Sequence, residues 1–376
     1  MMSKKIISVN LWYDKYYEKT NAQLKSFRKF SFETHIMTVK AKNNKLLCEI
    51  GAITDNLDTY DIIHTIEINK LMGLGYFALF KEFFRFVEDN KYDFIYIRRL
   101  MLKIIFASPY LRKLSKHVPI VYEIPTWPLD KTYSKSMDLR NKLEFTIFDK
   151  VSKDFSLIPV VLCNDVKLPD KWIPFLNSID IDRYPTPTKP ELNSTINILT
   201  VSNMANSHRY ERLLYAIKNY TGDYNISVTM ISRDTEPYRN VKKLAEELKL
   251  TGIINFRGEM KITDIAQIAG KYHIGIGILT YGEENRTIDT SLKNKDYCAM
   301  GLPFISTCKD LSFPAPFKYH YIVNNDSFEF NLEPIIKWYE NIYKDSNYRN
   351  KMYEYARNNI QYDNTAKEII EKICKR

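Results

Sequence analysis

The stretch SLKNKDYCAMGLPF, residues 291–304, decides how the second half of this chain is expected to fold. The polar pair Thr290-Ser291 is suited to begin a helix, and apolar residues then recur on one side of it. The Gly-Leu-Pro run at 301–303 ends that helix and begins a strand. Free amides at a helix N-terminus carry partial positive charge and hold anions such as a pyrophosphate. The stretch therefore predicts a helix over 291–300 with an anion site at its beginning.

The composition bounds the class of protein. At 376 residues the chain exceeds one ordinary core, so two domains are expected, and its 45% hydrophobic content suffices to pack them. We expect neither a secretory signal nor a membrane span, because no apolar run approaches about 18 uncharged residues. The five cysteines are scattered and lack metal-ligand or redox spacing. We interpret them as reduced packing residues, which predicts a cytoplasmic location.

The formal net charge of +10 has two interpretations. It is either a by-product of an Asn-, Lys-, Ile- and Tyr-rich composition or an attraction to an anionic partner. The segment 100–117, LMLKIIFASPYLRKLSKH, mixes apolar and basic residues as a membrane-surface helix does. One prediction is therefore peripheral contact with an anionic membrane, on the inner face of the cell membrane. Nucleic acid is not expected as a partner, because the basic residues form no dense cluster and no RRM, KH or zinc-finger signature is present.

Short apolar runs alternate with amphipathic segments in the first half of the chain. The runs predict strands at 5–10, 33–39, 94–97, 120–123, 156–163 and 172–176. The amphipathic segments predict helices at 18–29, 71–88, 103–115 and about 136–153. This alternation indicates an α/β domain with a parallel sheet and helices on both faces. A proline-rich stretch at 180–194 then indicates a linker.

A second series of strands and helices follows the linker. The strands are expected at 196–201, 226–232, 253–257, 273–279, 303–306 and 320–323. The helices are expected at about 207–219, 238–249, 262–271, 291–300, 332–343, 348–358 and 365–375. The predicted fold is α/β, with two doubly wound parallel sheets and a ligand in the cleft at the carboxyl ends of their strands. The expected domains are 1–182 and 183–376, and the last helix is a candidate to cross back to the first domain.

Five segments, in order, resemble the retaining glycosyltransferases of family 4, which have the GT-B fold. They are PIVYEIPTWPLDK (119–131), NSIDID (177–182), TVSNMANSHRYERLLYAI (200–217), HIGIGI (273–278) and SLKNKDYCAMGLPFI (291–305). The first is similar to a Glu-Ile-Pro-Thr-Tyr-Pro-Tyr-Asp-Lys segment of enzymes that make bacterial surface polysaccharides. The resemblance implies two Rossmann-like domains facing a central cleft, the first binding the acceptor and the second the nucleotide-sugar.

The resemblance also implies an activity. It implies that a sugar moves, with retention of anomeric configuration, from a nucleotide-sugar to a hydroxyl of a bacterial surface glycan or a lipid-linked acceptor, a UDP-sugar being the first candidate donor. It implies no metal and no cofactor, and no Asp-x-Asp motif is placed after a predicted strand to hold a cation. Two other functions stay open: a catalytically silent scaffold that binds nucleotide-sugars, and a nucleotide-sugar epimerase of the same fold.

The resemblance assigns site residues in the second domain. Lys293 is implied to neutralise the charge that grows on the leaving diphosphate, and Arg212 is assigned to catalysis with it. Asp296 is implied to accept hydrogen bonds from the ribose hydroxyls. The remaining donor-site residues are Asn203, His208, Asp289, Thr290, Ser291 and Leu292. For any one of these residues, a structural role on a helix surface is the competing interpretation.

In the first domain, the resemblance assigns three residues to the acceptor. Glu123 ends a predicted buried strand and is implied to bind the acceptor or to remove its proton. Thr126 and Trp127 follow it in the same segment and are implied to bind the acceptor.

The chain also departs from the family pattern. Family members usually carry two glutamates, separated by seven residues, before Gly-Leu-Pro; here Asp296 stands at the second position and Ile288 at the first. An isoleucine cannot hydrogen-bond a sugar, so we expect a neighbouring carboxylate to replace it. Asp289 is the first candidate, and Glu283 or Glu284 the alternative.

Two further departures concern glycine. Where family members read His-Gly, this chain reads His208-Arg209, which adds a guanidinium that would contact a phosphate or fill part of the site. The segment WYDKYYEKTN at 12–21 lacks the glycine-rich loop often found after the first strand.

Overall fold

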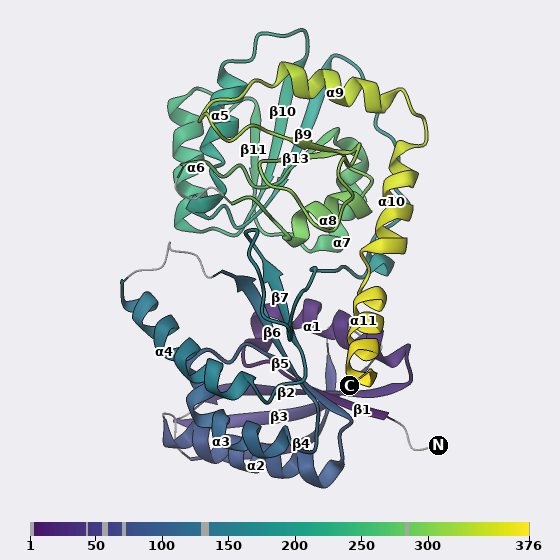
Figure 1. The fold of residues 1–376 in the computed structure, drawn as a ribbon. Helices are drawn as coiled ribbons and strands as arrows, with labels where there is room; N and C mark the ends of the chain where they lie inside the picture. The colour runs from purple at the N-terminus through teal and green to yellow at the C-terminus, as the bar shows by residue number, and fades with distance from the viewer. Residues whose placement is uncertain are drawn as a thin grey trace. The chain divides into compact units, whose positions relative to one another are not determined.

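The computed structural model describes residues 4–42, 44–54, 59–69, 73–128, 135–282 and 286–375. The chain divides into two compact units (Figure 1). Unit 1 comprises Met1–Leu162, Val166–Phe175 and Tyr362–Arg376, and unit 2 comprises Cys163–Asp165 and Leu176–Gln361. The NSIDID segment and the proline-rich stretch after it thus belong to unit 2, whereas the last helix belongs to unit 1.

Within the described residues, unit 1 is built on an eight-stranded sheet of order β4-β3-β2-β1-β5-β6-β7-β8. Its strands are β1 (Lys4–Val9), β2 (Phe32–Lys42), β3 (Lys45–Ile53), β4 (Tyr60–Ile68), β5 (Phe94–Arg98), β6 (Ile120–Trp127), β7 (Ile158–Leu162) and β8 (Trp172–Pro174). The sheet is mixed, because β3 pairs antiparallel with both β2 and β4. This corrects the expectation of a wholly parallel sheet. Neither of the two strands β3 and β4 was predicted. β4 exposes most of its residues, so it carries no apolar periodicity, whereas β3 alternates buried and partly exposed residues and was overlooked.

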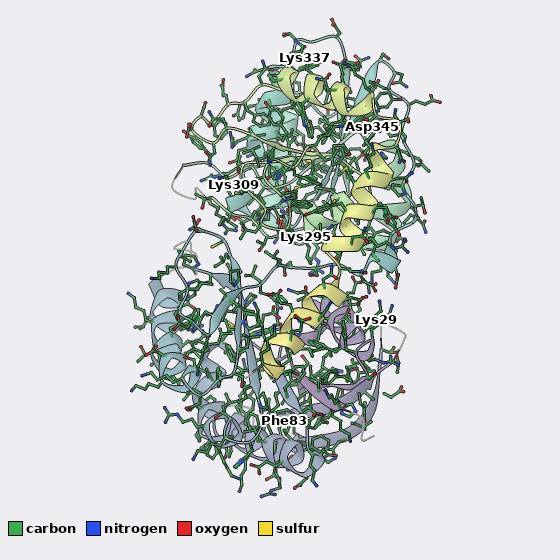
Figure 2. The ribbon with its side chains drawn as sticks, turned by 45° about the vertical axis from the view of Figure 1, so that its right-hand side comes forward. Lys29, Phe83, Lys295, Lys309, Lys337 and Asp345 are labelled. Carbon is green, nitrogen blue, oxygen red and sulfur yellow. The ribbon has the colours of Figure 1, made fainter. Side chains whose placement is uncertain are left out.

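Helices cover both faces of this sheet (Figure 1). One face carries α2 (Leu74–Asn90), the short 3-10 turn η1 (Met101–Lys103), α3 (Ile104–Leu114) and α4 (Lys135–Ser152), and the other carries α1 (Tyr13–Arg28) and α11 (Tyr362–Cys374). Phe83 of α2, labelled in Figure 2, is fully buried in the first layer. Phe27 and Phe94 meet edge to face at 5.6 Å in the second, beside Ile369 of α11. None of the described helices is long and apolar enough to cross a membrane.

In the part of the chain that is described, unit 2 has a six-stranded parallel sheet of order β11-β10-β9-β12-β13-β14. Its strands are β9 (Thr195–Val201), β10 (Asn225–Ile231), β11 (Ile254–Arg257), β12 (Ile274–Ile276), β13 (Phe304–Ser306) and β14 (His320–Ile322). The chain first steps outward in one direction from β9 and then returns to β12 on its other side. Open α/β sheets bind ligands at such a switch point, beyond the carboxyl ends of the strands.

The helices of unit 2 follow the predicted order. They are α5 (Glu211–Lys218), α6 (Glu236–Glu247), α7 (Ile262–Ile268), α8 (Leu292–Ala299), α9 (Glu333–Tyr343) and α10 (Tyr348–Asn359), with 3-10 turns η2 (Ile181–Arg183), η3 (Asn206–His208) and η4 (Ala269–Lys271). α5 and α6 lie on one side of the sheet and α7 and α8 on the other (Figure 1).

The predicted end of α8 is confirmed. Gly301 has a φ of +63°, and its N–H donates to the Cys298 carbonyl at 3.0 Å. The Leu302 N–H donates to the Tyr297 carbonyl at 2.8 Å, so a left-handed residue closes the helix before β13 begins. A side chain at position 301 would also meet the Arg349 backbone, since an added Cβ would lie 2.9 Å from its carbonyl oxygen.

Candidate functional site

Tyr297 of α8 spans the switch point of the unit 2 sheet. β9 and β12 stay paired as far as Ile276, and beyond that residue the Tyr297 hydroxyl bridges the two strands. It accepts the Val201 N–H at 3.0 Å and donates to the Ile276 carbonyl at 3.0 Å. Gly275 leaves room for the tyrosine ring, because a Cβ there would lie 2.8 Å from it. The helix is therefore held directly beside the diverging strand ends.

Three polar side chains meet just beyond the end of β9. The Ser202 hydroxyl lies 2.9 Å from His208 Nδ1 and 3.3 Å from Lys293 Nζ. Lys293 Nζ is 3.4 Å from the same His208 nitrogen and 5.9 Å from the centroid of the Tyr210 ring. Lys293 stands in the first turn of α8, so its charge adds to that of the helix N-terminus. We call Ser202, His208 and Lys293 the switch-point cluster.

Burial sets the protonation of this cluster. It lowers the pKa of Lys293 to about 8, with Arg286 adding repulsion and the Asp289 carboxylate opposing the shift. The pKa of His208 falls well below its ordinary value because of burial and of the positive charges on Lys293 and Arg286. The imidazole is therefore neutral at pH 7, while the lysine is mostly charged. An anion placed here would relieve the repulsion among these groups.

Asp289 shapes the turn that leads into α8. Its two carboxylate oxygens accept from the Ser291 N–H at 2.9 Å and from the Ser291 hydroxyl at 2.7 Å. Ile288 beside it is buried and bridges to Lys309. We expected Asp289 to take the place of the family glutamate. In the structure, both oxygens of its carboxylate are already bonded to Ser291. The alternative residues, Glu283 and Glu284, lie outside the described part of the chain.

Asn177 of the NSIDID segment and Tyr184 just after that segment contact α8 or the turn before it, and sequence reasoning assigned neither residue to the site. Asn177 donates to the Thr290 carbonyl at 2.7 Å, and the Tyr184 hydroxyl donates to Asp296 at 2.6 Å. Asn177 could have been found from its place in the family motif, whereas Tyr184 gave no signal. Ser202 was overlooked beside the assigned Asn203, which is exposed and accepts from a neighbouring amide. The remaining assigned residue, Leu292, packs its side chain against the unit 2 core.

Arg212 is fully buried and bonds only to backbone carbonyls in this structure. Its five hydrogen bonds, at 2.7–3.0 Å, go to the carbonyls of Phe328, Leu279, Thr280, Asn324 and Ser327. A guanidinium has five N–H groups, so its donors are fully used. This geometry supports a positioning role, in which Arg212 holds the loops after β12 and β14, and gives no support to a catalytic contact.

Arg209 occupies the position where the family has glycine, and it keeps a glycine-like backbone. Its φ is +52°, in the left-handed region, and its N–H caps the short turn at the Asn206 carbonyl. The guanidinium lies 3.4 Å from Glu211. Arg209 therefore adopts a backbone conformation that a glycine adopts more readily.

A buried ion pair anchors the start of α8 from behind. Lys295, labelled in Figure 2, lies 3.0 Å from Asp310, and both side chains are fully buried. The same ammonium donates to the Ser291 carbonyl at 3.2 Å, and Asn294 donates to Asp310 at 3.2 Å. Sequence reasoning missed this pair, because its members are 15 residues apart and nothing local marks them.

In unit 1, Glu123 lies one residue before the end of the buried part of β6 and is itself fully buried. One oxygen accepts from Arg98 at 2.7 Å and lies 3.6 Å from Lys19, and the other accepts from the Tyr96 hydroxyl at 2.7 Å. Burial acts to raise its pKa, but the two cations and the tyrosine outweigh burial and lower it. The carboxylate is therefore ionised at pH 7 and is a weak base.

Thr126 and Trp127 follow Glu123 along β6. The Thr126 hydroxyl donates to the Pro125 carbonyl at 2.7 Å. Trp127 packs against Phe145 and Trp172, with ring centroids 5.2 and 5.1 Å away. Both residues are half-buried. Among the described residues of both units, no three His, Cys, Asp or Glu side chains gather as metal ligands would.

No protein-family model matches this chain, and no curated protein matches it in sequence. Solved structures do match its fold over nearly the whole length. A glycosyltransferase from Rickettsia africae ESF-5 has a TM-score of 0.70 at 15% identity, covering 100% of this chain and 99% of its own. HepE from Anabaena, in complex with UDP and glucose, has a TM-score of 0.63 at 10% identity, covering 99% and 100%.

A Listeria monocytogenes structure described as a UDP-N-acetylglucosamine 2-epimerase matches with a TM-score of 0.54 at 11% identity, covering 98% of this chain and 95% of its own. At such identities the likeness establishes the fold. The chain has the GT-B fold of nucleotide-sugar glycosyltransferases, with two α/β units.

Proposed function

We propose that this protein is a retaining glycosyltransferase that moves a sugar from a UDP-sugar to a hydroxyl of a bacterial surface glycan or a lipid-linked acceptor. The observation that supports it most is the switch-point cluster, which combines a partly buried ammonium with a helix N-terminus beyond the carboxyl ends of the unit 2 strands, where open α/β sheets bind ligands. The HepE structure of the same fold contains UDP and glucose. The resemblance of the NSIDID and SLKNKDYCAMGLPFI segments to family 4 supports the retaining class.

The donor diphosphate lies against Lys293 in this proposal. Negative charge grows on the diphosphate as the sugar–oxygen bond breaks, and a fixed ammonium in a buried site stabilises that charge without reorganising. The neutral His208 donates a hydrogen bond to the diphosphate and carries no charge itself. The amides after Thr290 and Ser291 add partial positive charge, so the mechanism requires no metal ion. Asn203 and Leu292 border the same region.

The ribose lies against Asp296. Its carboxylate accepts the ribose hydroxyls, and the bond from Tyr184 fixes its orientation. The acceptor side is assigned to Glu123, Thr126 and Trp127 of unit 1. Because the pKa of Glu123 is lowered, this carboxylate does not remove the proton of the acceptor hydroxyl. It holds Arg98 and Lys19 instead, and these two side chains orient the hydroxyl. In retention, the acceptor attacks from the face the diphosphate leaves, so the departing diphosphate takes the proton.

A screen of nucleotide-sugars tests the proposal. A bound donor stabilises the fold by mass action, so one UDP-sugar should raise the melting temperature while the matching free sugar does not. The stabilising donor should then release UDP slowly by hydrolysis, with EDTA present, and the released sugar should keep its anomeric configuration by NMR. If no nucleotide-sugar stabilises the protein or is turned over, the silent-scaffold function replaces this one.

The epimerase is the second candidate, because a Listeria monocytogenes structure of that description shares the fold. It differs in product. Incubation with UDP-N-acetylglucosamine, followed by separation of the sugar nucleotides, would show an epimerised nucleotide-sugar with no acceptor present. Transfer to an acceptor, without such a product, favours the glycosyltransferase. For the glycosyltransferase, we also propose a cytoplasmic location with peripheral contact to the inner face of the cell membrane.

A further inference from the structure

The net charge of the protein is confined to one unit. Unit 1 contains 32 lysines and arginines against 22 aspartates and glutamates, whereas unit 2 contains 23 of each. The formal charge of +10 is therefore carried entirely by unit 1. A composition effect would spread over both units, since both are rich in lysine. The asymmetry indicates that unit 1 meets an anionic partner.

Large apolar side chains are exposed on the helices of one face of unit 1. Relative exposure is 73% for Leu74 and 41% for Phe77 in the first turn of α2, and 36% for Ile105 in the first turn of α3. On α4 it is 70% for Leu139 and 49% for Leu143, which are one turn apart. We call these five residues the apolar rim.

The topology places the rim along one edge of the sheet. β4, β5 and β6 all run in the direction of β1, because β4 is antiparallel to β3, β3 is antiparallel to β2, and the other pairs are parallel. The helices that follow these strands, α2, α3 and α4, pack side by side and begin at the carboxyl edge (Figure 1). α2 and α3 expose apolar residues in their first turn, and α4 exposes Leu139 and Leu143 within its first half, so the rim begins at that edge.

An exposed tryptophan extends the rim. Trp12 lies just beyond the carboxyl end of β1 and is 42% exposed. Lys103, at the start of α3, lies 5.0 Å from the Trp12 ring and 5.2 Å from the Tyr76 ring of α2. Tryptophan, tyrosine and lysine together are typical of a membrane–water interface.

Cations follow the rim along the same helices. We call them the basic band: Lys81, Arg85, Arg112, Lys113, Lys116, Lys150 and Lys153. Two are paired within the layer, Arg85 with Glu82 at 2.9 Å and Lys113 with Glu88 at 3.0 Å. The exposed acids over the same helices and the residues just after them are fewer, and they are Glu88, Asp89, Asp149 and Asp154.

We propose that the apolar rim and the basic band dock unit 1 on an anionic lipid bilayer. The rim enters the interface between headgroups and acyl chains, and the band contacts the headgroup phosphates. A nucleic acid would use the band but would leave the exposed leucines without a role. This docking gives a specific form to the membrane contact that is part of the proposed function. It depends on the charge and the exposed apolar side chains of unit 1, and it does not require that the protein transfers a sugar. It would bring the edge that carries Glu123 to the membrane surface, where a lipid-linked acceptor resides.

Vesicle co-sedimentation of the full chain tests the apolar rim. The wild type should bind vesicles of phosphatidylcholine mixed with phosphatidylglycerol, and should bind pure phosphatidylcholine far more weakly. The double variant Leu139→Ser with Leu143→Ser should lose roughly tenfold in affinity, because each leucine gives up its transfer to the acyl boundary. The matched control is Leu311→Ser with Ile322→Ser in unit 2, which are 42% and 47% exposed and should bind as the wild type does.

Charge-reversal variants test the basic band. Lys150→Glu with Lys153→Glu should weaken binding to the mixed vesicles by roughly fivefold or more per position, whereas Lys218→Glu with Lys242→Glu in unit 2 should not. Added salt should weaken wild-type binding. Unchanged binding of the rim variant overturns the proposal in favour of a purely electrostatic polyanion surface. Absence of wild-type binding to the mixed vesicles overturns it outright. Melting temperature with and without the stabilising nucleotide-sugar, measured in each variant, separates these outcomes from misfolding or loss of the donor site.

Discussion

Lys293 and His208 illustrate how burial determines charge at the scale of single residues. Lys293 lies 3.4 Å from His208, in a region where burial disfavours positive charge on either side chain. The lysine keeps its proton at pH 7, while the imidazole does not. The arrangement holds one positive charge ready for an anion, and that charge is lost near pH 8. Donor binding should therefore respond to pH in a way that an ordinary surface lysine would not produce.

Affinity for UDP should fall as pH rises through about 8. An anion favours the protonated lysine and raises its pKa, so the attraction is complete below the pKa of the free protein and is lost above it, by up to about tenfold per pH unit. Isothermal titration calorimetry at a series of pH values measures this. Lys293→Arg is the control, because its guanidinium stays charged throughout and the same ligand is titrated. Parallel pH profiles for the two proteins would contradict the assignment of Lys293 to the diphosphate.

Asp296→Asn should weaken UDP binding by about 1.5–3 kcal/mol while the fold stays intact, since charge-assisted hydrogen bonds to the ribose are lost. Tyr184→Phe removes only the bond that orients Asp296, so a smaller loss of about 0.5–1.5 kcal/mol is expected. Calorimetric titration with UDP and a urea melt of each variant provide the measurements. Unchanged affinity in Asp296→Asn would show that this carboxylate is not the ribose ligand.

At the scale of elements, α8 and α5 are held in place by buried polar groups rather than by apolar packing alone. Lys295 and Asp310 tie the start of α8 to the loop after β13. Arg212 ties α5 to the loops that follow β12 and β14. Each group is fully buried and fully bonded, so removing one partner leaves carbonyls or a charge without water. The site geometry depends on these contacts.

Arg212→Met should lower the free energy of unfolding by about 3 kcal/mol or more, because five carbonyls lose their donors at once. Arg212→Lys should rescue little of this, since an ammonium cannot span the same set. Urea unfolding measures both, and Arg357→Lys, an exposed arginine paired with Glu354, is the control with a change within about 0.5 kcal/mol. A stable Arg212→Met protein with lost turnover would restore the catalytic assignment.

At the scale of the whole molecule, the chain forms two units, and residues 362–374 return to the first of them. α11 packs against α1 and contributes Ala366 and Ile369 to the core on that face of unit 1. Unit 1 therefore needs residues 362–374 to complete this core. Unit 2 is built from one nearly continuous segment, 176–361, and so needs no such closure.

Ile369→Ala should destabilise unit 1 by about 2–4 kcal/mol and leave unit 2 largely unaffected. The matched variant is Ile342→Ala, which empties an equally buried position in unit 2, each isoleucine being 1% exposed. Hydrogen exchange followed by mass spectrometry reports each unit separately. Faster exchange in α1 and β2 is expected for the first variant, and faster exchange in β9 to β14 for the second. The reverse pattern would contradict the division into units.

The sequence by itself determined the order of helices and strands in unit 2 and the helix over 291–300 with its glycine stop. These features depend on local signals, namely apolar periodicity and a residue that accepts positive φ. Such signals are set by residues that are close together in the chain. It also located Lys293 and Asp296 on one helix and Ser291 at its N-terminal cap, since spacing along a helix follows from the sequence. The sequence analysis did not locate β3 or β4: the exposed edge strand β4 has no such pattern, whereas β3 alternates buried and partly exposed residues and was overlooked.

Only the tertiary structure decided what each side chain contacts. Arg212 is bonded to carbonyls up to 116 residues away, and Asp296 to a tyrosine 112 residues away. Glu123 is held between Arg98 and Lys19, which are 25 and 104 residues away in the chain. The physical reason is that a buried polar group must find its hydrogen-bond partner wherever the fold brings one. Residue types and local spacing do not specify that partner, whereas the packing of distant segments does.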